Sequence, residues 1–134
     1  MRYLLDTNIC IYAIKGHASV MGKLGDAGLA ACAISAVALA ELSYGIARSA
    51  SPYRSRNLSA LREFVDLFEI LPWSAEAAWK HGPLRQQLAV AGTPIGEFDL
   101  LIGAHALAQD LILVTNNTRE FERIEGLKLE NWAA

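Results

Sequence analysis

The run Leu111-Ile112-Leu113-Val114 is followed at once by the polar residues Thr115-Asn116-Asn117-Thr118. A short apolar run without alternation predicts a strand that is buried on both faces, as in a parallel sheet. Helical periodicity precedes it over residues 96–109, and a short helix is predicted over 118–123. This stretch therefore predicts an α/β arrangement in which polar side chains gather where a strand ends.

The same alternation extends through the rest of the chain. Strands are predicted over residues 2–5, 30–34 and 68–71, with an edge strand at 128–129, and helices over 18–26, 36–49 and 57–67. Thr7-Asn8 offers a cap for a first helix, Ser35 and Ser74 offer caps for later ones, and residues 49–56 have the composition of a loop. We expect an α/β fold with a mostly parallel central sheet covered on both faces, formed by residues 1–134 as a single domain.

The composition excludes several classes of protein. Hydrophobic residues make up 53% of the chain and charged residues 19%, which is typical of a compact fold and not of a disordered chain. Cys10 and Cys32 lie in apolar segments, so we expect buried reduced thiols and no disulfide framework. No uncharged apolar run approaches the roughly 18 residues of a membrane span, and Asp6 interrupts the N-terminus too early for a secretory signal. We expect a cytoplasmic protein without a membrane partner.

Three carboxylates stand out because no Lys or Arg is placed to pair with them on their own segments. Asp6 ends the first predicted strand, while Glu41 and Asp99 lie in apolar helices with only uncharged residues three and four positions away. Each has an ordinary explanation: Asp6 as a helix cap, Glu41 as a solvated side chain, and Asp99 as an acid stabilised by a helix dipole. If the three converge, their mutual repulsion requires a cation.

Carboxylate oxygens from separate segments favour Mg²⁺ or Mn²⁺, which prefer hard oxygen ligands. His17, His81 and His105 have no metal-ligand spacing, so zinc is disfavoured and His105 is interpreted as structural. The chain also lacks a glycine-rich phosphate loop with lysine and the common motifs of serine hydrolases and zinc proteases. Metal chemistry supported by acids is the remaining interpretation.

Four segments carry a resemblance to a known family. They are Leu4-Leu5-Asp6-Thr7-Asn8, residues 35–42 around Glu41, residues 94–106 around Asp99, and residues 113–121. In this order and spacing they resemble the motifs of a PIN domain, most closely those of the VapC toxin family of type II toxin–antitoxin systems. The resemblance extends over nearly the whole chain.

This resemblance implies a three-layer α/β/α sandwich and a Mg²⁺-dependent endoribonuclease, with Mn²⁺ able to substitute. By position, Asp6, Glu41 and Asp99 match the acidic site residues, with Asp6 and Asp99 as direct metal ligands and Glu41 bound directly or through water. The fourth acidic position departs from the family, because Asn117 stands there and Glu120 follows a turn later. Whether Asn117 or Glu120 completes the site, and whether it holds one ion or two, stays open.

Further residues are expected around these acids. We predict that a set of polar residues supports the metal site, either by binding the cation or by orienting its ligands. The alternative role for these residues is helix capping. Its members are Thr7, Asn8, Thr115, Asn116 and Glu120. We predict that a cluster of basic and aromatic residues binds RNA. An equally weighted alternative is that these residues only form a solvated loop. Its members are Arg48, Tyr53, Arg54 and Arg56.

The resemblance also implies partners. It predicts an RNA substrate, with tRNA as one candidate, a cognate VapB-type antitoxin, a homodimer, and a larger toxin–antitoxin assembly that contacts DNA only through the antitoxin. The net charge of −2 does not oppose RNA binding, because setting aside Asp6, Glu41, Asp99 and Glu120 changes it to +2. The alternatives are a catalytically inactive PIN-type binding module and, less favoured, a receiver-like phospho-acceptor regulator.

Overall fold

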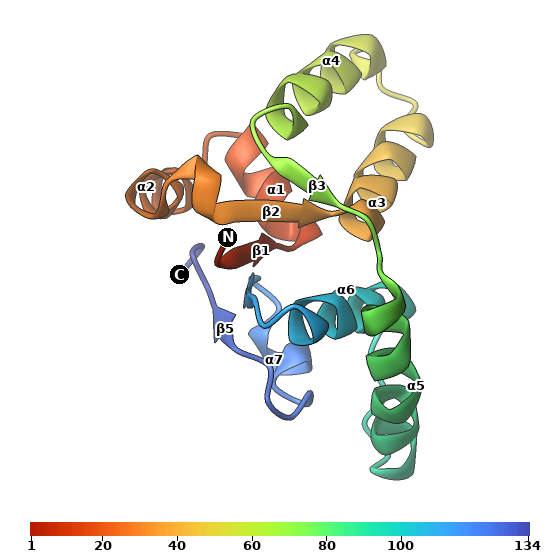
Figure 1. Cartoon of the computed structure of the whole chain (residues 1–134). Helices are drawn as coiled ribbons and strands as arrows, with labels where there is room; N and C mark the ends of the chain where they lie inside the picture. Colours follow the sequence, from red (N-terminus) through yellow and green to blue (C-terminus); the bar gives the residue numbers. More distant parts are fainter.

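The computed structural model describes all 134 residues and is built around a five-stranded sheet (Figure 1). The strands are β1 (Tyr3–Leu5), β2 (Cys32–Ser35), β3 (Glu69–Leu71), β4 (Ile112–Val114) and β5 (Leu129–Glu130), in the order β3-β2-β1-β4-β5. Every neighbouring pair is parallel, so all five strands end at the same edge of the sheet. The α/β prediction is confirmed, and the sheet is entirely rather than mostly parallel.

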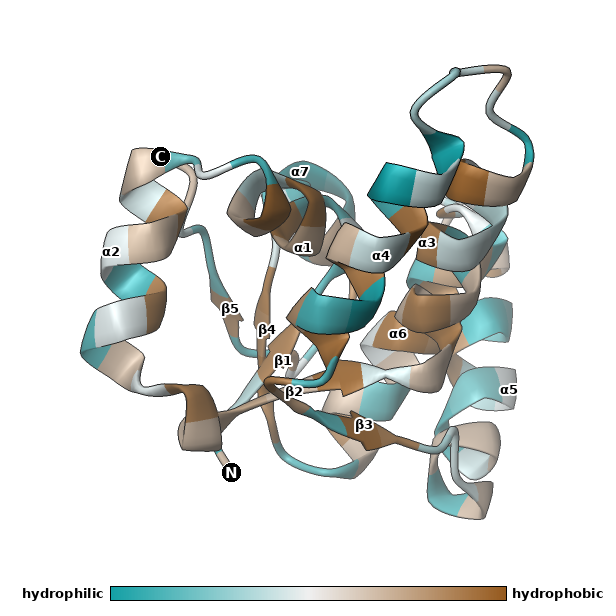
Figure 2. Cartoon of the chain, turned by 90° about the horizontal axis from the view of Figure 1, so that it is seen from above, coloured by the Kyte–Doolittle hydropathy of each residue, from teal (hydrophilic) through white to brown (hydrophobic).

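Helices cover the sheet on both faces, which gives the three layers that the resemblance implied (Figures 1 and 2). They are α1 (Thr7–Ile14), α2 (Ala18–Ala27), α3 (Ala36–Ala47), α4 (Arg54–Val65), α5 (Ala75–Val90), α6 (Glu97–Ala108) and α7 (Thr118–Phe121). In Figure 1, α1, α2 and α4 lie on one side of the sheet and α5, α6 and α7 on the other. Helix α3 contacts α1 and α4 on the first side and also α6 on the second.

Helix starts follow the capping rules at most of the predicted positions. The Ser35 hydroxyl accepts the backbone N–H of Val37 and caps α3, and Ser74 caps α5 in the same way. The first helix differs from the prediction, because it begins at Thr7 with Asp6 as its N-cap. The cap predicted at Thr7-Asn8 was therefore wrong: the Asp6 carboxylate already accepts the N–H of Thr7 at 2.8 Å.

Two other boundaries differ from the sequence-based expectation. Residues 29–31 form a short 3-10 turn after Gly28 (φ +86°), so the second strand starts at Cys32 instead of residue 30. The predicted loop 49–56 ends early, because α4 begins at Arg54, whose N–H donates to the Ser51 carbonyl. The other predicted helix and strand limits agree with the structure to within two residues.

The core is centred on β1, β2 and β4, whose Leu4, Ile34 and Leu113 are completely buried. Figure 2 shows these strands as the apolar centre, with hydrophilic residues on the outer faces of α4 and α5. Cys10 and Cys32 are buried free thiols, as expected. None of the helices combines the length and the apolar character that crossing a membrane requires.

Candidate functional site

The site begins where two neighbouring strands end. Leu5 of β1 pairs with Val114 of β4, so the next residues, Asp6 and Thr115, lie side by side at the carboxyl edge of the sheet. The Thr115 hydroxyl donates a 2.7 Å hydrogen bond to Asp6 Oδ2. Asp6 is 2% exposed, which is unusual for a carboxylate without a basic partner. The parallel sheet thus holds one acid rigidly at its edge.

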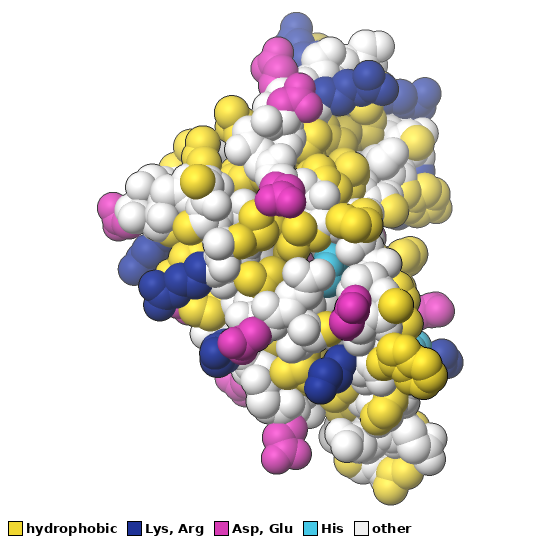
Figure 3. All heavy atoms as spheres, in the orientation of Figure 1, with side chains coloured by type: hydrophobic (Ala, Val, Ile, Leu, Met, Phe, Trp, Pro, Cys, Tyr) yellow, Lys and Arg dark blue, Asp and Glu magenta, His cyan; other side chains and the backbone are white.

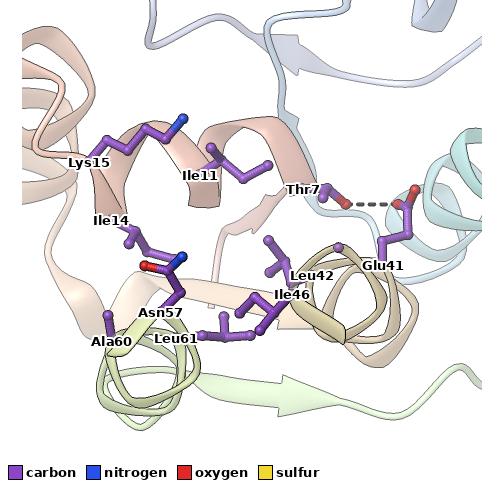
Figure 4. A pocket seen from close by; sticks show the side chains of 11 residues that line it. Thr7, Ile11, Ile14, Lys15, Glu41, Leu42, Ile46, Asn57, Ala60 and Leu61 are labelled. Carbon is purple, nitrogen blue, oxygen red and sulfur yellow. Dashed lines mark hydrogen bonds between the residues drawn. The ribbon is translucent and has the colours of Figure 1, made fainter. Parts of the chain in front are cut away.

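A second acid comes from α3. Glu41 is partly buried, and its Oε1 accepts a 2.8 Å hydrogen bond from the hydroxyl of Thr7, the first residue of α1 (Figure 4). Because Thr7 follows Asp6 directly, this contact places Glu41 beside the same strand end. The structure therefore brings together Asp6, Thr7 and Glu41, which were predicted separately as site residues.

The third and fourth acids come from α6 and α7. Asp99 lies in the first turn of α6, and its carboxyl group lies within hydrogen-bonding reach of that of Glu120 in α7. Gly103, one turn further along α6, faces Phe121 of α7 and Ile124, which follows α7: a Cβ at position 103 would lie 2.6 Å from Ile124 Cδ1 and 3.5 Å from Phe121 Cε1. The absence of a side chain at position 103 therefore leaves room for residues 121–124 against α6, one turn from Asp99.

The pKa values of Asp6 and Asp99 are raised by burial and by neighbouring acids. Burial is the main reason that the pKa of Asp6 is raised, and Glu41 adds to the shift, while hydrogen bonds from Thr115 and Thr7 oppose it. Burial also raises the pKa of Asp99 to about 7, with further contributions from Asp6, the Glu120 hydrogen bond and charge, and Glu41. The acids predicted to converge therefore lie within electrostatic range of each other.

The donor chemistry fits a hard divalent cation. The cluster offers carboxylate oxygens from four segments, and no Lys or Arg forms an ion pair with any of them, since the chain's one salt bridge joins Lys128 to Asp110. The carboxylates do not form a ready-made cage, because no three His, Cys, Asp or Glu side chains are arranged to hold an ion. Asp6 and Glu41 are turned toward threonine hydroxyls instead. A cation would offset both the burial of these carboxylates and their mutual repulsion, which together raise the pKa values of Asp6 and Asp99.

Asn117 and Glu120 act together at the fourth position. The Asn117 side-chain amide donates to Glu120 Oε2 at 2.8 Å, and the Asn117 backbone N–H donates to the Thr115 hydroxyl at 2.9 Å. This arrangement leaves the Asn117 amide oxygen without a hydrogen-bond partner in the protein and holds Glu120 next to Asp99. Hydrogen bonds thus link Thr115, Asn117 and Glu120 into one network beside the acidic cluster.

A second polar network adjoins it and includes two residues that sequence reasoning missed. Asn8 Oδ1 accepts the backbone N–H of Asn116 at 3.2 Å, as expected for supporting residues. The Asn116 side chain also donates to the Tyr12 hydroxyl and accepts from Asn131, each at 3.3 Å. Neither Tyr12 nor Asn131 was predicted as a site residue, and Asn131 lies beyond the last predicted strand. Asn116 is 104 positions from Tyr12 and 15 positions from Asn131 in the sequence, and no local pattern predicts contacts over such separations.

The basic cluster predicted to bind RNA lies away from the four acids, where α3 and α4 are joined. Arg54 donates from Nε to the Ser49 carbonyl at 2.9 Å, and the Arg56 guanidinium lies 5.1 Å from the centre of the Tyr53 ring. Arg48 stacks similarly on Tyr44 at 5.7 Å. All these arginines are exposed, and Figure 3 shows Lys and Arg side chains gathered over this end of the molecule. Arg54 and Arg56 lie in the first turn of α4, which corrects their predicted loop position.

A groove extends from the acidic site along α1, α3 and α4. It has a volume of about 360 Å³, lies between α1, α3 and α4, and is lined mainly by apolar side chains such as Ile11, Ile14 and Ile46 (Figure 4). Thr7 and Glu41 form one end of it, and Asn57 of α4 lies on its wall. A mainly apolar groove that ends at Glu41 suits an amphipathic segment better than an RNA backbone.

Comparison with known proteins agrees with this geometry. The PIN domain family model matches residues 3–127. The chain is 42% identical to the tRNA(fMet)-specific endonuclease VapC of Shigella flexneri over 133 residues, which is 99% of each chain. It is 44% identical to Ribonuclease VapC2 of Rickettsia felis over 136 residues, with 98% of each chain covered. The crystal structure of DNA-bound VapBC from Salmonella typhimurium superposes with a TM-score of 0.91 at 38% identity, covering 98% of each chain.

The fold and the acidic edge of the sheet therefore define a PIN domain, and the chain belongs to that family. Within it, full-length relatives at 42% and 44% identity place the chain in the VapC group. Both steps of the resemblance found in the sequence are confirmed. The strand order β3-β2-β1-β4-β5 also differs from the 2-1-3-4-5 order of receiver-like folds, which removes the phospho-acceptor alternative.

Proposed function

We propose that this protein is a divalent-metal-dependent endoribonuclease and the toxin of a type II toxin–antitoxin pair. The convergence of Asp6, Glu41, Asp99 and Glu120 from four separate segments carries the proposal. Such a cluster is unfavourable in a folded protein unless a cation offsets its charge, and the relatives named ribonucleases share the whole chain length.

Asp6 and Asp99 are the direct ligands of the cation, Mg²⁺ or Mn²⁺, and Glu41 binds it directly or through water. When bound, the cation lowers the pKa of the attacking water and offsets charge on the scissile phosphate. Thr115 and Thr7 orient Asp6 and Glu41 by hydrogen bonds of 2.7 and 2.8 Å. Glu120 supplies the fourth carboxylate, and Asn117 orients it.

The substrate is RNA, and tRNA is the candidate, because the Shigella flexneri relative is named as specific for tRNA(fMet). Arg48 and Arg56 contact the phosphate backbone, and Tyr53 offers a ring on which a base stacks. These side chains are exposed, and Arg54 contributes less because its guanidinium is bonded to the Ser49 carbonyl.

The partner is a VapB-type antitoxin, since the similar solved structures from Salmonella typhimurium and Rickettsia felis are VapBC complexes bound to DNA. The groove between α1, α3 and α4 takes an apolar antitoxin segment, which then lies against Glu41 and blocks the site. The toxin forms homodimers within a larger assembly, and DNA is contacted only through the antitoxin.

Cleavage of a tRNA mixture by the purified protein tests this function. Cleavage should require Mg²⁺ or Mn²⁺, stop in EDTA, and disappear in Asp99→Asn, with melting curves showing that the variant is folded. A folded wild-type protein that cleaves no RNA and binds no Mn²⁺ at millimolar concentration would show instead a catalytically inactive binding module.

A further inference from the structure

A buried histidine joins the two helices that carry Glu41 and Asp99. His105 of α6 is 0% exposed, and its Nδ1 lies 2.9 Å from the hydroxyl oxygen of Ser35. Ser35 ends β2 and caps α3, where its hydroxyl oxygen also accepts the Val37 N–H at 3.1 Å. This is the only side-chain hydrogen bond between the residues of α6 and those of α3 or its cap.

This contact is not needed to fill the core. The other ring nitrogen of His105, Nε2, is buried without a hydrogen-bond partner, which destabilises the fold. Burial lowers the pKa of His105, so the ring is neutral and one nitrogen bonds Ser35 in either tautomer. An apolar residue of similar size would avoid the unsatisfied atom. The polar pair therefore points to a role other than packing.

The positions of the pair on their helices suggest that role. Glu41 follows Ser35 by six residues on α3, and Asp99 precedes His105 by six residues on α6. Six helical residues correspond to roughly 9 Å along each axis. The Ser35–His105 hydrogen bond therefore joins α3 to α6 between one and two turns from each carboxylate. A change in helix separation at this bond changes the separation of Glu41 and Asp99.

We propose that Ser35 and His105 are positioning residues that set the separation of α3 and α6, and with it the spacing between Glu41 and Asp99 at which both act on one cation. The inference rests on the proposed metal-dependent function. Neither residue touches the substrate or the cation. Trp73 holds α6 independently, because its Nε1 donates to the Leu101 carbonyl at 2.9 Å, so α6 stays attached to the fold when the pair is broken.

Three variants separate the hydrogen bond from packing. His105→Leu removes the bond and fills the space with an apolar side chain, while His105→Asn keeps a polar atom near the Nδ1 position. Ser35→Gly removes the bond from the other side, and glycine is tolerated at a helix N-cap. Val20→Ala is the matched control, because Val20 is fully buried in α2 and distant in sequence from every acid of the site.

Mn²⁺ affinity is measured by calorimetry without RNA, and kcat and KM are measured on tRNA. We expect His105→Leu and Ser35→Gly to weaken Mn²⁺ binding and lower kcat by about 10- to 100-fold, with KM changed less than twofold. His105→Asn should recover most of both losses. Val20→Ala should lower the melting temperature but leave Mn²⁺ affinity and kcat near wild type.

The inference is overturned if His105→Leu and Ser35→Gly lower only the melting temperature, as Val20→Ala does. If His105→Leu does not fold, Ser35→Gly and His105→Asn decide the question by the same comparison. If the wild-type protein binds Mn²⁺ but cleaves no RNA, only the nuclease proposal is contradicted. The Mn²⁺ affinities of the variants then still test the positioning role. Absence of Mn²⁺ binding by wild type contradicts both.

Discussion

The Thr7 hydroxyl donates to Glu41 Oε1 at 2.8 Å, while the Thr7 backbone N–H donates to Asp6 Oδ1 at the same distance. One residue therefore orients two carboxylates, one from the end of β1 and one from the middle of α3. Asp6 also accepts from Thr115 at 2.7 Å, so both oxygens of this buried acid are occupied. The acidic cluster is held by uncharged donors, which leave its negative charge available to a cation.

Thr7→Val should reduce kcat for RNA cleavage by about 10- to 100-fold, because Glu41 loses the donor that orients it. Valine has nearly the same shape, and the backbone N–H bond to Asp6 is retained. Thr7→Ser keeps the hydroxyl and should stay within a few-fold of wild type. Single-turnover cleavage rates of the three proteins decide the matter, and equal rates for valine and threonine would contradict an orienting role.

Asp6→Asn should raise the melting temperature in EDTA, because it removes a buried charge that Glu41 and Asp99 repel. Asparagine caps a helix about as well as aspartate, so the start of α1 is retained. Saturating Mg²⁺ should reverse the order, since binding to the folded state stabilises wild type by about 1.4 kcal/mol at tenfold over Kd and about 2.7 at a hundredfold. Melting curves across a metal series test this, and an equal metal-dependent rise in both proteins would exclude Asp6 as a ligand.

Stability in EDTA should fall as the pH rises from about 4 to 7. The pKa of Asp99 is raised to about 7 from 3.8, so in this window the folded chain keeps a proton that the unfolded chain has lost. The stabilisation from Asp99 is thus complete below pH 3.8 and is lost by about pH 7. Urea unfolding at several pH values should show this slope in wild type and a smaller one in Asp99→Asn.

Mn²⁺ affinity should have the opposite pH dependence, because the proton on Asp99 competes with the cation. Below pH 7 the affinity should fall by up to about tenfold per unit. A pH-independent Kd between pH 5 and 7 would show that Asp99 is not a ligand.

Replacing Arg48 and Arg56 with Ala should weaken tRNA binding and flatten its salt dependence, because fewer phosphates are neutralised. Each lost phosphate contact should reduce the slope of log K against log salt by about 0.7 to 0.9. Arg54→Ala should have a smaller effect on the slope, since its guanidinium is bonded to Ser49. An unchanged slope in the double variant would place RNA binding on another surface.

Gly103→Ala should cost about 1–3 kcal/mol of folding free energy, because its Cβ would lie 2.6 Å from Cδ1 of the buried Ile124 and that side chain would have to move. A shift of residues 121–124 should also weaken Mn²⁺ binding, because Glu120 directly precedes them. Gly22→Ala is the control, since a Cβ there meets nothing within 4 Å and alanine favours helix α2. A Gly103→Ala protein as stable as Gly22→Ala would contradict the close packing.

Much of the fold could be predicted from local sequence. The apolar runs around Leu4, Ile34 and Leu113 indicated buried strands, and the caps at Ser35 and Ser74 marked helix starts, because both signals depend on neighbouring residues only. The start of α4 was predicted three residues late, since its first turn, Arg54-Ser55-Arg56, is polar and lacks an apolar period. Glu41 and Asp99 were recognised as unusual because no basic residue lies three or four positions from either of them.

The sequence by itself determined the residue types of the site, the order of its segments and the strand ends at which they appear. Only the tertiary structure decided which groups touch: Thr7 with Glu41 across 34 residues, Asp99 with Glu120, and Ser35 with His105 across 70. Periodicity and capping report interactions within a few residues along the chain. Contacts between helices depend instead on strand order and on how closely helices pack, as at Gly103, and those follow from burying the whole core at once.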